Sequence, residues 1–254
     1  MVKLDRWKIF WGILLVAFST CAYIVHYLIF RDPHHLFIFL VGDFAFVFVE
    51  VLLVTMIIHE LLNYREKKAV EEKMNMIIGA FFSEVGSPLL RLFAGFDRGS
   101  EELKNRLAGC GRWPDEAFEE AARACRLYAQ GIAIDCEQGD LIVLRNFLLE
   151  KRTFMLSLLQ NPKLIAHEKF TDLLWAIFHL TEELALRNDL SGLGEADARH
   201  IATDIERAYK ALTEMWIGHM FRLKADYPYL FSLAVRMNPF DPDASPNVKE
   251  QAGG

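Results

Sequence analysis

Two long apolar runs near the N-terminus constrain the fold of this chain more than any other feature. Residues 9–30 form a run of 22 residues without formal charge, and residues 36–58 form a run of 23 residues whose only formal charges are Asp43 and Glu50. As a helix rising about 1.5 Å per residue, each run extends roughly 33 Å, which is enough to cross the ~30 Å hydrocarbon core of a bilayer. We therefore predict a transmembrane hairpin within residues 1–60, with spans at about 9–30 and 36–58.

The cations that flank the two runs predict the orientation of the hairpin. The connecting residues 31–35 are too short to cross the membrane again and hold a single cation, Arg31, offset by Asp32. Cations gather before the first run and after the second, and loops rich in Lys and Arg stay on the cytoplasmic side. We expect both termini in the cytoplasm and the protein in the inner (cytoplasmic) cell membrane. The flanking cations are Lys3, Arg6, Lys8, Arg65, Lys67, Lys68 and Lys73.

The remainder of the chain has the pattern of an acidic, all-α domain. The chain holds 28 Lys and Arg against 34 Asp and Glu, a net charge of −6, and its first 50 residues hold equal numbers of both signs. An acidic domain lacks the basic face that binds nucleic acid, so we expect no nucleic-acid partner. Helical periodicity predicts a cytoplasmic helical bundle over residues 61–237, beginning with a stalk that continues the second span. Apolar residues recur at helical spacing in Leu144, Phe147, Leu148, Phe154, Leu158 and in Leu173, Leu174, Ile177, Phe178, Leu184.

Glycine and proline divide this domain into predicted helices. Ser100 and Asp115, each followed by acidic residues, are expected to begin helices, because acidic side chains favour the positive end of the helix dipole. Only residues 131–134 fit a strand, and residues 238–254 form a polar tail that we expect to be mobile. Breaks are predicted at residues 95–100, 109–114, 131, 138–140, 161–162, 191–194 and 227–228.

Three segments carry a resemblance to a known family. These are residues 144–155 (LRNFLLEKRTFM), residues 226–236 (DYPYLFSLAVR) and the closing pattern of residues 238–242 (NPFDP). Over most of its length the chain resembles an uncharacterised prokaryotic family of small two-span membrane proteins with a helical cytoplasmic domain. The resemblance implies this architecture and assigns no activity, cofactor or catalytic residue.

Asp43 and Glu50 are the residues of the hairpin that most need an explanation. Seven residues apart, they lie on one stripe of the second span, and intramembrane carboxylates normally face protein or a water-filled path. Counting from the turn places Asp43 level with residues 21–23 and near His26, which offer hydrogen bonds, whereas Glu50 lies level with the apolar residues 14 and 15. Two roles stay open: interhelical packing, or an acidic ring that serves ion or proton permeation.

The histidines suggest weaker hypotheses. His34 and His35 lie at the outer turn and His59 at the cytoplasmic interface, where solvation is their expected state. In the helical domain, His179 precedes Glu182 and Glu183 by three and four residues, and a second group follows in Asp197, His200 and Asp204. We interpret both groups as ion pairs and helix caps and expect no metal site and no cofactor, because a true Glu-x-x-His pattern is missing.

The motifs of common catalytic sites are also missing. The sequence has no Gly-x-Ser-x-Gly, no phosphate-binding loop and no cysteine at an informative distance from a histidine. We therefore expect no catalytic residues and a non-enzymatic membrane protein. Its hairpin would anchor and oligomerise the helical domain for partner docking or signal transmission. The expected partners are the lipid bilayer, further copies of the chain and a cytoplasmic protein. The alternative is a homo-oligomeric cation channel or transporter whose second spans line the path.

Overall fold

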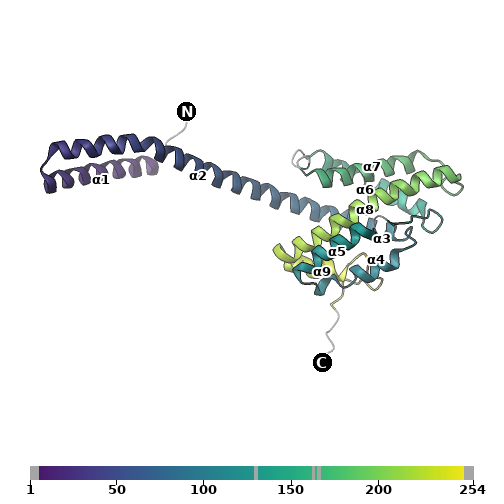
Figure 1. Cartoon of the computed structure of the whole chain (residues 1–254). Coiled ribbons are helices and arrows are strands. Elements are labelled where there is room, and N and C mark those ends of the chain that lie inside the picture. Colours follow the sequence, from purple (N-terminus) through teal and green to yellow (C-terminus); the bar gives the residue numbers. More distant parts are fainter. Residues whose placement is uncertain (1–5, 129–130, 162–163, 165–166, 249–254) are drawn as a thin grey trace, which may run out of the picture. The chain divides into compact units, whose positions relative to one another are not determined.

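The computed structural model describes residues 6–128, 131–161, 164 and 167–248 (Figure 1). Contacts divide the chain into two units, Met1–Lys68 and Ala69–Gly254, which are described separately below. The described residues are predominantly helical and contain no β-strand, so the all-α prediction is confirmed. The segment considered as a strand makes a single antiparallel bridge instead, between Ile134 and Asp97.

The first unit consists of helix α1 (Arg6–Phe30) and the first part of helix α2 (Pro33–Phe81), joined by two residues. Arg31 takes a left-handed backbone conformation (φ 50°), which ends α1. Asp32 accepts a hydrogen bond from the backbone N–H of His34 (2.9 Å), and Pro33 begins α2 at a position where no N–H donor is needed. Both predicted spans therefore lie within helices, and their passage through a membrane stays a prediction.

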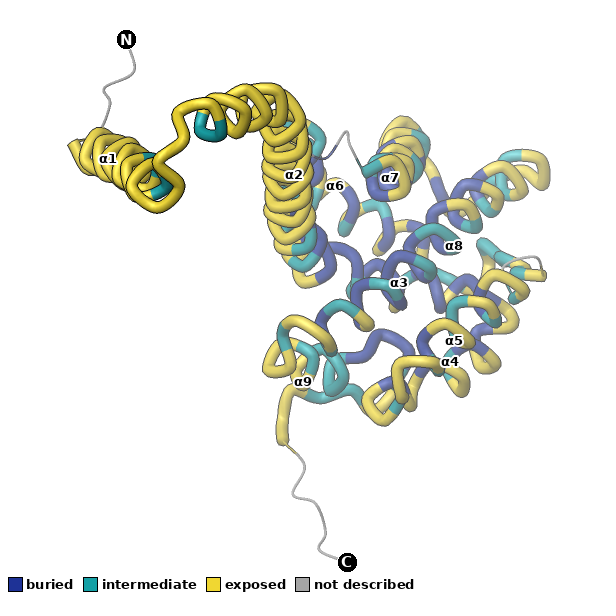
Figure 2. The backbone as a smooth tube through the Cα atoms, turned by 60° about the vertical axis from the view of Figure 1, so that its left-hand side comes forward, coloured by how far each residue is buried: buried dark blue, intermediate teal, exposed yellow. Residues whose placement is uncertain are grey.

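The two helices of the first unit bury almost none of their surface. No residue of α1 is buried, and the most apolar windows of α1 and of the helical segment that starts at Pro33 are 0% buried. Figure 2 shows α1 and the neighbouring part of α2 as exposed apart from a few residues of intermediate burial. Bulky apolar side chains point outward in every direction, as Leu15 (67% exposed), Phe18 (75%) and Phe44 (67%) illustrate.

The second unit is a bundle of helices. The last part of α2 passes into a single π-helical turn, η1 (Phe82–Gly86), and from there into α3 (Ser87–Ala94). The sequence accounts for this irregular turn, because Pro88 has no N–H group and its ring would clash with the carbonyl of Glu84 in a regular α-helix. The remaining elements are α4 (Ser100–Leu107), the short 3₁₀ turn η2 (Cys110–Arg112), α5 (Asp115–Tyr128), α6 (Leu141–Leu159), α7 (Glu168–Leu186), α8 (Glu195–Asp226) and α9 (Pro228–Arg236).

Helix α8 forms the centre of this bundle. It packs against α7, α5, α9 and α3, while α6 packs against the far side of α7. The helix starts predicted at Ser100 and Asp115 are confirmed, as are the predicted breaks in the described residues; Pro162 lies outside them. The apolar sets predicted for α6 and α7 face the core, Phe147 and Phe154 only in part. Fully buried residues of α8 include Ile201, Ile205, Ala208, Tyr209 and Leu212.

The residues after α9 correct one expectation. A mobile tail was expected from residue 238, but Asn238 (0% exposed) and Phe240 (1%) are buried in the bundle. The Asn238 side chain donates to the carbonyl of Leu107 (2.9 Å) and accepts from the backbone N–H of Phe240 (2.9 Å), and the Phe240 ring packs edge-on against Trp216. The prolines that gave this segment the appearance of a tail instead shape a strap that covers one end of the core.

This strap generates a stability prediction. We expect residues 69–248, expressed alone, to give a helical far-UV circular dichroism spectrum, and Phe240→Ala to lower the free energy of unfolding of this fragment by about 3–5 kcal/mol, because it leaves a cavity in the core. Urea denaturation followed by circular dichroism measures the difference. Asp243→Ala changes an exposed residue of the same strap and should leave the midpoint unchanged. Equal stability of the two variants would contradict a buried strap.

Candidate functional site

The polar residues of the hairpin form two contacts close to the turn. The Tyr23 hydroxyl donates to the Asp43 carboxylate (2.8 Å), and the His26 and His35 rings stack with Nε2 and Nδ1 3.4 Å apart. The predicted level of Asp43, opposite residues 21–23, is thereby confirmed. The Tyr23–Asp43 bond gives this carboxylate a partner within its own chain.

The other polar residues of the hairpin do not join these contacts. Glu50 makes no hydrogen bond or ion pair with any residue that the structure describes, and His59 is exposed. His34 contributes its backbone N–H to the cap at Asp32 and is exposed. The structure therefore pairs Asp43 with Tyr23 and His26 with His35, and gives Glu50 no partner among the described residues.

Two cysteines and two histidines of the bundle are buried in its packing or cap a helix. Burial raises the pKa of the Cys110 thiol to about 12 and that of Cys125 to about 11, so both stay protonated at neutral pH. Burial likewise lowers the pKa of His219 to about 4, and its neutral ring stacks on Phe82 with centroids 4.8 Å apart. His167 caps α7 by accepting from the N–H of Phe170 (3.3 Å). None of these groups is arranged as a nucleophile or a general base.

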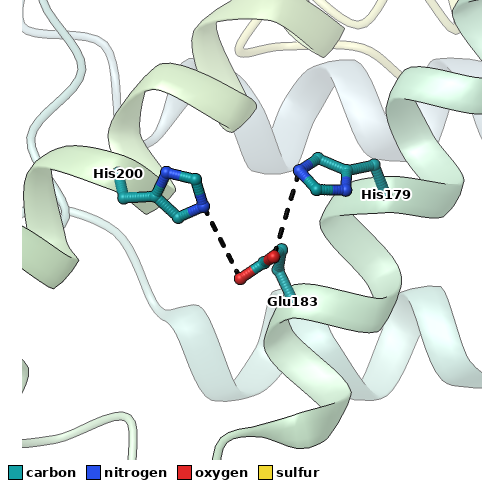
Figure 3. A group of neighbouring side chains, drawn as sticks. All are labelled: His179, Glu183 and His200. Atoms are coloured by element: carbon teal, nitrogen blue, oxygen red, sulfur yellow. Dashed lines mark ion pairs between the residues drawn. The ribbon is translucent and has the colours of Figure 1, made fainter.

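The clearest concentration of reactive groups lies between α7 and α8 (Figure 3). His179 and Glu183 are one turn apart on α7, and His200 and Asp204 are one turn apart on α8. Glu183 lies between the two imidazoles, with carboxylate oxygens 4.0 Å from His179 Nε2 and 3.6 Å from His200 Nε2 (Figure 3). Asp204 Oδ2 lies 3.3 Å from His179 Nε2 and 3.5 Å from His200 Nε2. We call these four residues the α7–α8 cluster.

Asp204 is the buried member of the α7–α8 cluster. Its side chain is 2% exposed, whereas those of His179 and His200 are 47% and 51% exposed. Oδ1 accepts from Arg207 (2.9 Å), but Oδ2 has no hydrogen-bond partner among the described residues. Asp97, which is buried to a similar degree, differs in this respect: its two oxygens accept from the N–H of Gly99 (2.9 Å) and the Tyr128 hydroxyl (2.6 Å).

A guanidinium group fixes the second carboxylate of the α7–α8 cluster. Arg187 donates to a Glu183 oxygen (2.5 Å) and binds Asp197 with two donors (2.6 and 3.1 Å). The hydrogen bond from Arg187, and more weakly the charges of Arg187 and the two imidazoles, hold the pKa of the Glu183 carboxyl below its usual range. Glu183 is therefore an anion at neutral pH, with one oxygen directed toward each imidazole.

The sequence predicts two separate groups on two helix faces, His179 with Glu182 and Glu183, and Asp197 with His200 and Asp204. The packing of α7 on α8 brings four of these residues into one cluster. Glu182 and Asp197 remain outside it, where they bind Arg152 and Arg187. The available signal was the repetition of one pattern, His followed four residues later by a carboxylate, on two consecutive helices.

A groove elsewhere on the bundle was not foreseen. It encloses about 490 Å³ among α5, the start of α7 and α8, with Phe118, Ile217 and Phe221 in its apolar lining. Within its lining, Glu214 binds both Arg126 (3.7 Å) and Lys169 (3.1 Å), whereas the buried Nε of Arg222 has no hydrogen-bond partner among the described residues.

Comparison with known proteins places these two units in a family. Residues 70–236 match the family described as the uncharacterized protein MJ1433, C-terminal helical domain, and residues 2–62 match the MJ1433 N-terminal helical domain. The chain is 41% identical over 236 residues to the uncharacterized protein MJ1433 of Methanocaldococcus jannaschii, an alignment that covers 93% of this chain and 94% of the relative. No solved structure matches the chain. The chain belongs to the MJ1433 family, whose members combine an N-terminal and a C-terminal helical domain.

Proposed function

We propose that this chain is an integral membrane protein in which α1 and the first part of α2 cross the cytoplasmic membrane and anchor the helical bundle on the cytoplasmic side. One observation carries the proposal: the most apolar windows of both helices are 0% buried by the rest of the chain. An apolar helix in the core of a soluble protein is covered by its neighbours, whereas these helices expose apolar side chains on all faces. Each such side chain gains about 1.5–3 kcal/mol on leaving water, which a lipid environment supplies.

In this proposal the bundle works as an interaction module and not as an enzyme. Supporting it, the thiols of Cys110 and Cys125 and the ring of His219 lie in apolar surroundings that suppress their reactivity. The module would bind a cytoplasmic protein or transmit a signal from the hairpin.

The anchoring proposal is tested by extraction. The full chain is expected to remain in the membrane fraction after washing with high salt and with alkaline carbonate, and to be released by detergent, because its attachment is hydrophobic. Residues 69–248, which lack the hairpin, should stay in the soluble fraction and serve as the matched control. Release of the full chain by carbonate would reject the anchor.

The orientation is tested by cysteine labelling. In a chain whose four native cysteines are replaced by serine or alanine, His34→Cys should react with a membrane-impermeant maleimide added to intact cells, because the turn faces outward. Glu66→Cys should react only after the cells are opened. The reverse pattern would invert the topology, and labelling of both sites in intact cells would reject a membrane hairpin.

We base the proposed assembly of several copies on a difference in hydrogen bonding between Asp43 and Glu50, the two carboxylates of the second predicted span. Asp43 has Tyr23 as a partner in its own chain, whereas Glu50 has none among the described residues. A carboxyl group facing lipid near the bilayer centre costs roughly 2.5–3.5 kcal/mol on insertion scales. Contact with Glu50 of another copy removes this cost, so the proposal includes a homo-oligomer whose second spans meet at residue 50.

Substitution of Glu50 separates packing from permeation. Glu50→Gln keeps a hydrogen-bonding side chain and should preserve the oligomer, whereas Glu50→Leu should weaken it about 3- to 30-fold, which corresponds to the roughly 0.6–2 kcal/mol of an interhelical hydrogen bond in a membrane. Analytical ultracentrifugation in detergent measures the association constant, with Val49→Leu as control.

A second measurement decides for or against the channel alternative. If both Glu50 substitutions preserve the oligomer but change cation flux into liposomes, an acidic ring in a pore explains the residue. If assembly and flux both remain as in the unsubstituted chain, Glu50 has neither role.

A further inference from the structure

We propose that the α7–α8 cluster is a binding site for one divalent first-row transition-metal ion. Its ligands are Nε2 of His179, Nε2 of His200, and one carboxylate oxygen each from Glu183 and Asp204. This inference is independent of the membrane anchor, because all four residues lie within the helical bundle. It replaces the expectation that these residues make only ion pairs and caps.

The spacing of the ligand atoms is the first argument. Four ligands at about 2.1 Å from a tetrahedral ion lie about 3.4 Å from one another. The nitrogen-to-oxygen distances in the α7–α8 cluster are 3.3, 3.5, 3.6 and 4.0 Å. One ligand atom each from His179, Glu183 and His200 can be chosen so that all three lie within 4.8 Å of one another. Asp204 Oδ2, within 3.5 Å of both Nε2 atoms, would be the fourth ligand, and the half-exposed imidazoles and Glu183 would have to rotate to close on one ion.

The free oxygen of Asp204 is the second and independent argument. A buried carboxylate oxygen without a hydrogen-bond partner is costly, and native proteins normally satisfy such an atom. Oδ2 of Asp204 lies between two imidazole nitrogens but forms a hydrogen bond with neither. A cation between the four side chains would satisfy this oxygen and both nitrogens at once. The equally buried Asp97 has hydrogen-bond donors on both oxygens and needs no such ion.

The charges and the outer contacts also fit a divalent ion. The two carboxylates of the cluster supply the negative charge that attracts a divalent cation. Arg207 and Arg187 hold the two carboxylates from outside, at Asp204 and Glu183, as outer hydrogen-bond partners commonly orient metal ligands. The half-exposed imidazoles leave a route by which the ion enters.

The donor set selects the class of ion. Two imidazoles with two carboxylates suit Zn²⁺, Fe²⁺ and related ions, whereas Ca²⁺ and Mg²⁺ prefer sites made wholly of oxygen and Cu⁺ prefers sulfur. We use Zn²⁺ as the probe because it is redox-inert and accepts four nitrogen and oxygen ligands.

The test measures Zn²⁺ binding to the full chain in detergent by isothermal titration calorimetry. We expect one ion per chain, and at least a 10- to 100-fold weaker affinity for His200→Gln and for Asp204→Asn, because loss of a ligand costs no less than loss of an outer partner. Glu182→Gln, one residue from the cluster on α7, is the matched control and should bind as the unsubstituted chain does. The double variant His26→Ala, His35→Ala removes the other close histidine pair and should also retain binding.

Two further measurements make each result decisive. Circular dichroism verifies that the variants fold, and His200→Gln decides alone if the buried Asp204→Asn does not fold, because the His200 side chain is 51% exposed. Co²⁺ added in place of Zn²⁺ should produce visible absorption bands that His200→Gln abolishes. The proposal is overturned if the full chain binds no stoichiometric Zn²⁺, if His200→Gln binds within threefold of the unsubstituted chain, or if only the His26, His35 variant loses binding.

Discussion

The packing of α7 against α8 is the contact on which most of the bundle depends. Ile177 and Phe178 of α7 and Ile201 and Ile205 of α8 are buried in one core, and the register of that core is set by their apolar spacing. His179 follows directly on the apolar pair of α7, and His200 precedes Ile201. The packing that buries these apolar residues therefore also brings the two neighbouring imidazoles together at the edge of the core.

A buried carboxylate beside such a core requires compensation. The desolvation of a charged group costs several kcal/mol in a folded protein, and this cost is offset only when its lone pairs are occupied. Arg207 contributes little toward this, because its side chain is 57% exposed and solvent screens the pair. An apolar side chain at position 204 would fit the core without this cost. The ion that we propose for the α7–α8 cluster would occupy the oxygen of Asp204 that has no hydrogen-bond partner.

The sequence predicted the helices better than it predicted their contacts. Periodicity in α6 and α7, acidic helix starts at Ser100 and Asp115, and the glycine and proline breaks are local features, and local features determine where a helix begins and ends. The buried strap at Asn238 and the α7–α8 cluster depend on residues more than 20 or more than 100 positions apart, such as His179 with His200 and Asn238 with Leu107. No helical pattern encodes which helices pack together, so these features required the structure.

The hairpin also contains a carboxylate without a hydrogen-bond partner among the described residues, but here the proposed surroundings are lipid. Asp43 faces Tyr23, whose hydroxyl group occupies one oxygen of the carboxylate. Glu50 lies two turns further along α2, opposite a part of α1 that offers only apolar side chains at residues 14 and 15. Water solvates an unpaired carboxylate on a protein surface, but the proposed lipid environment does not. In the proposed membrane a single hairpin would leave Glu50 without a partner among the described residues, and the proposed second copy of α2 would supply one.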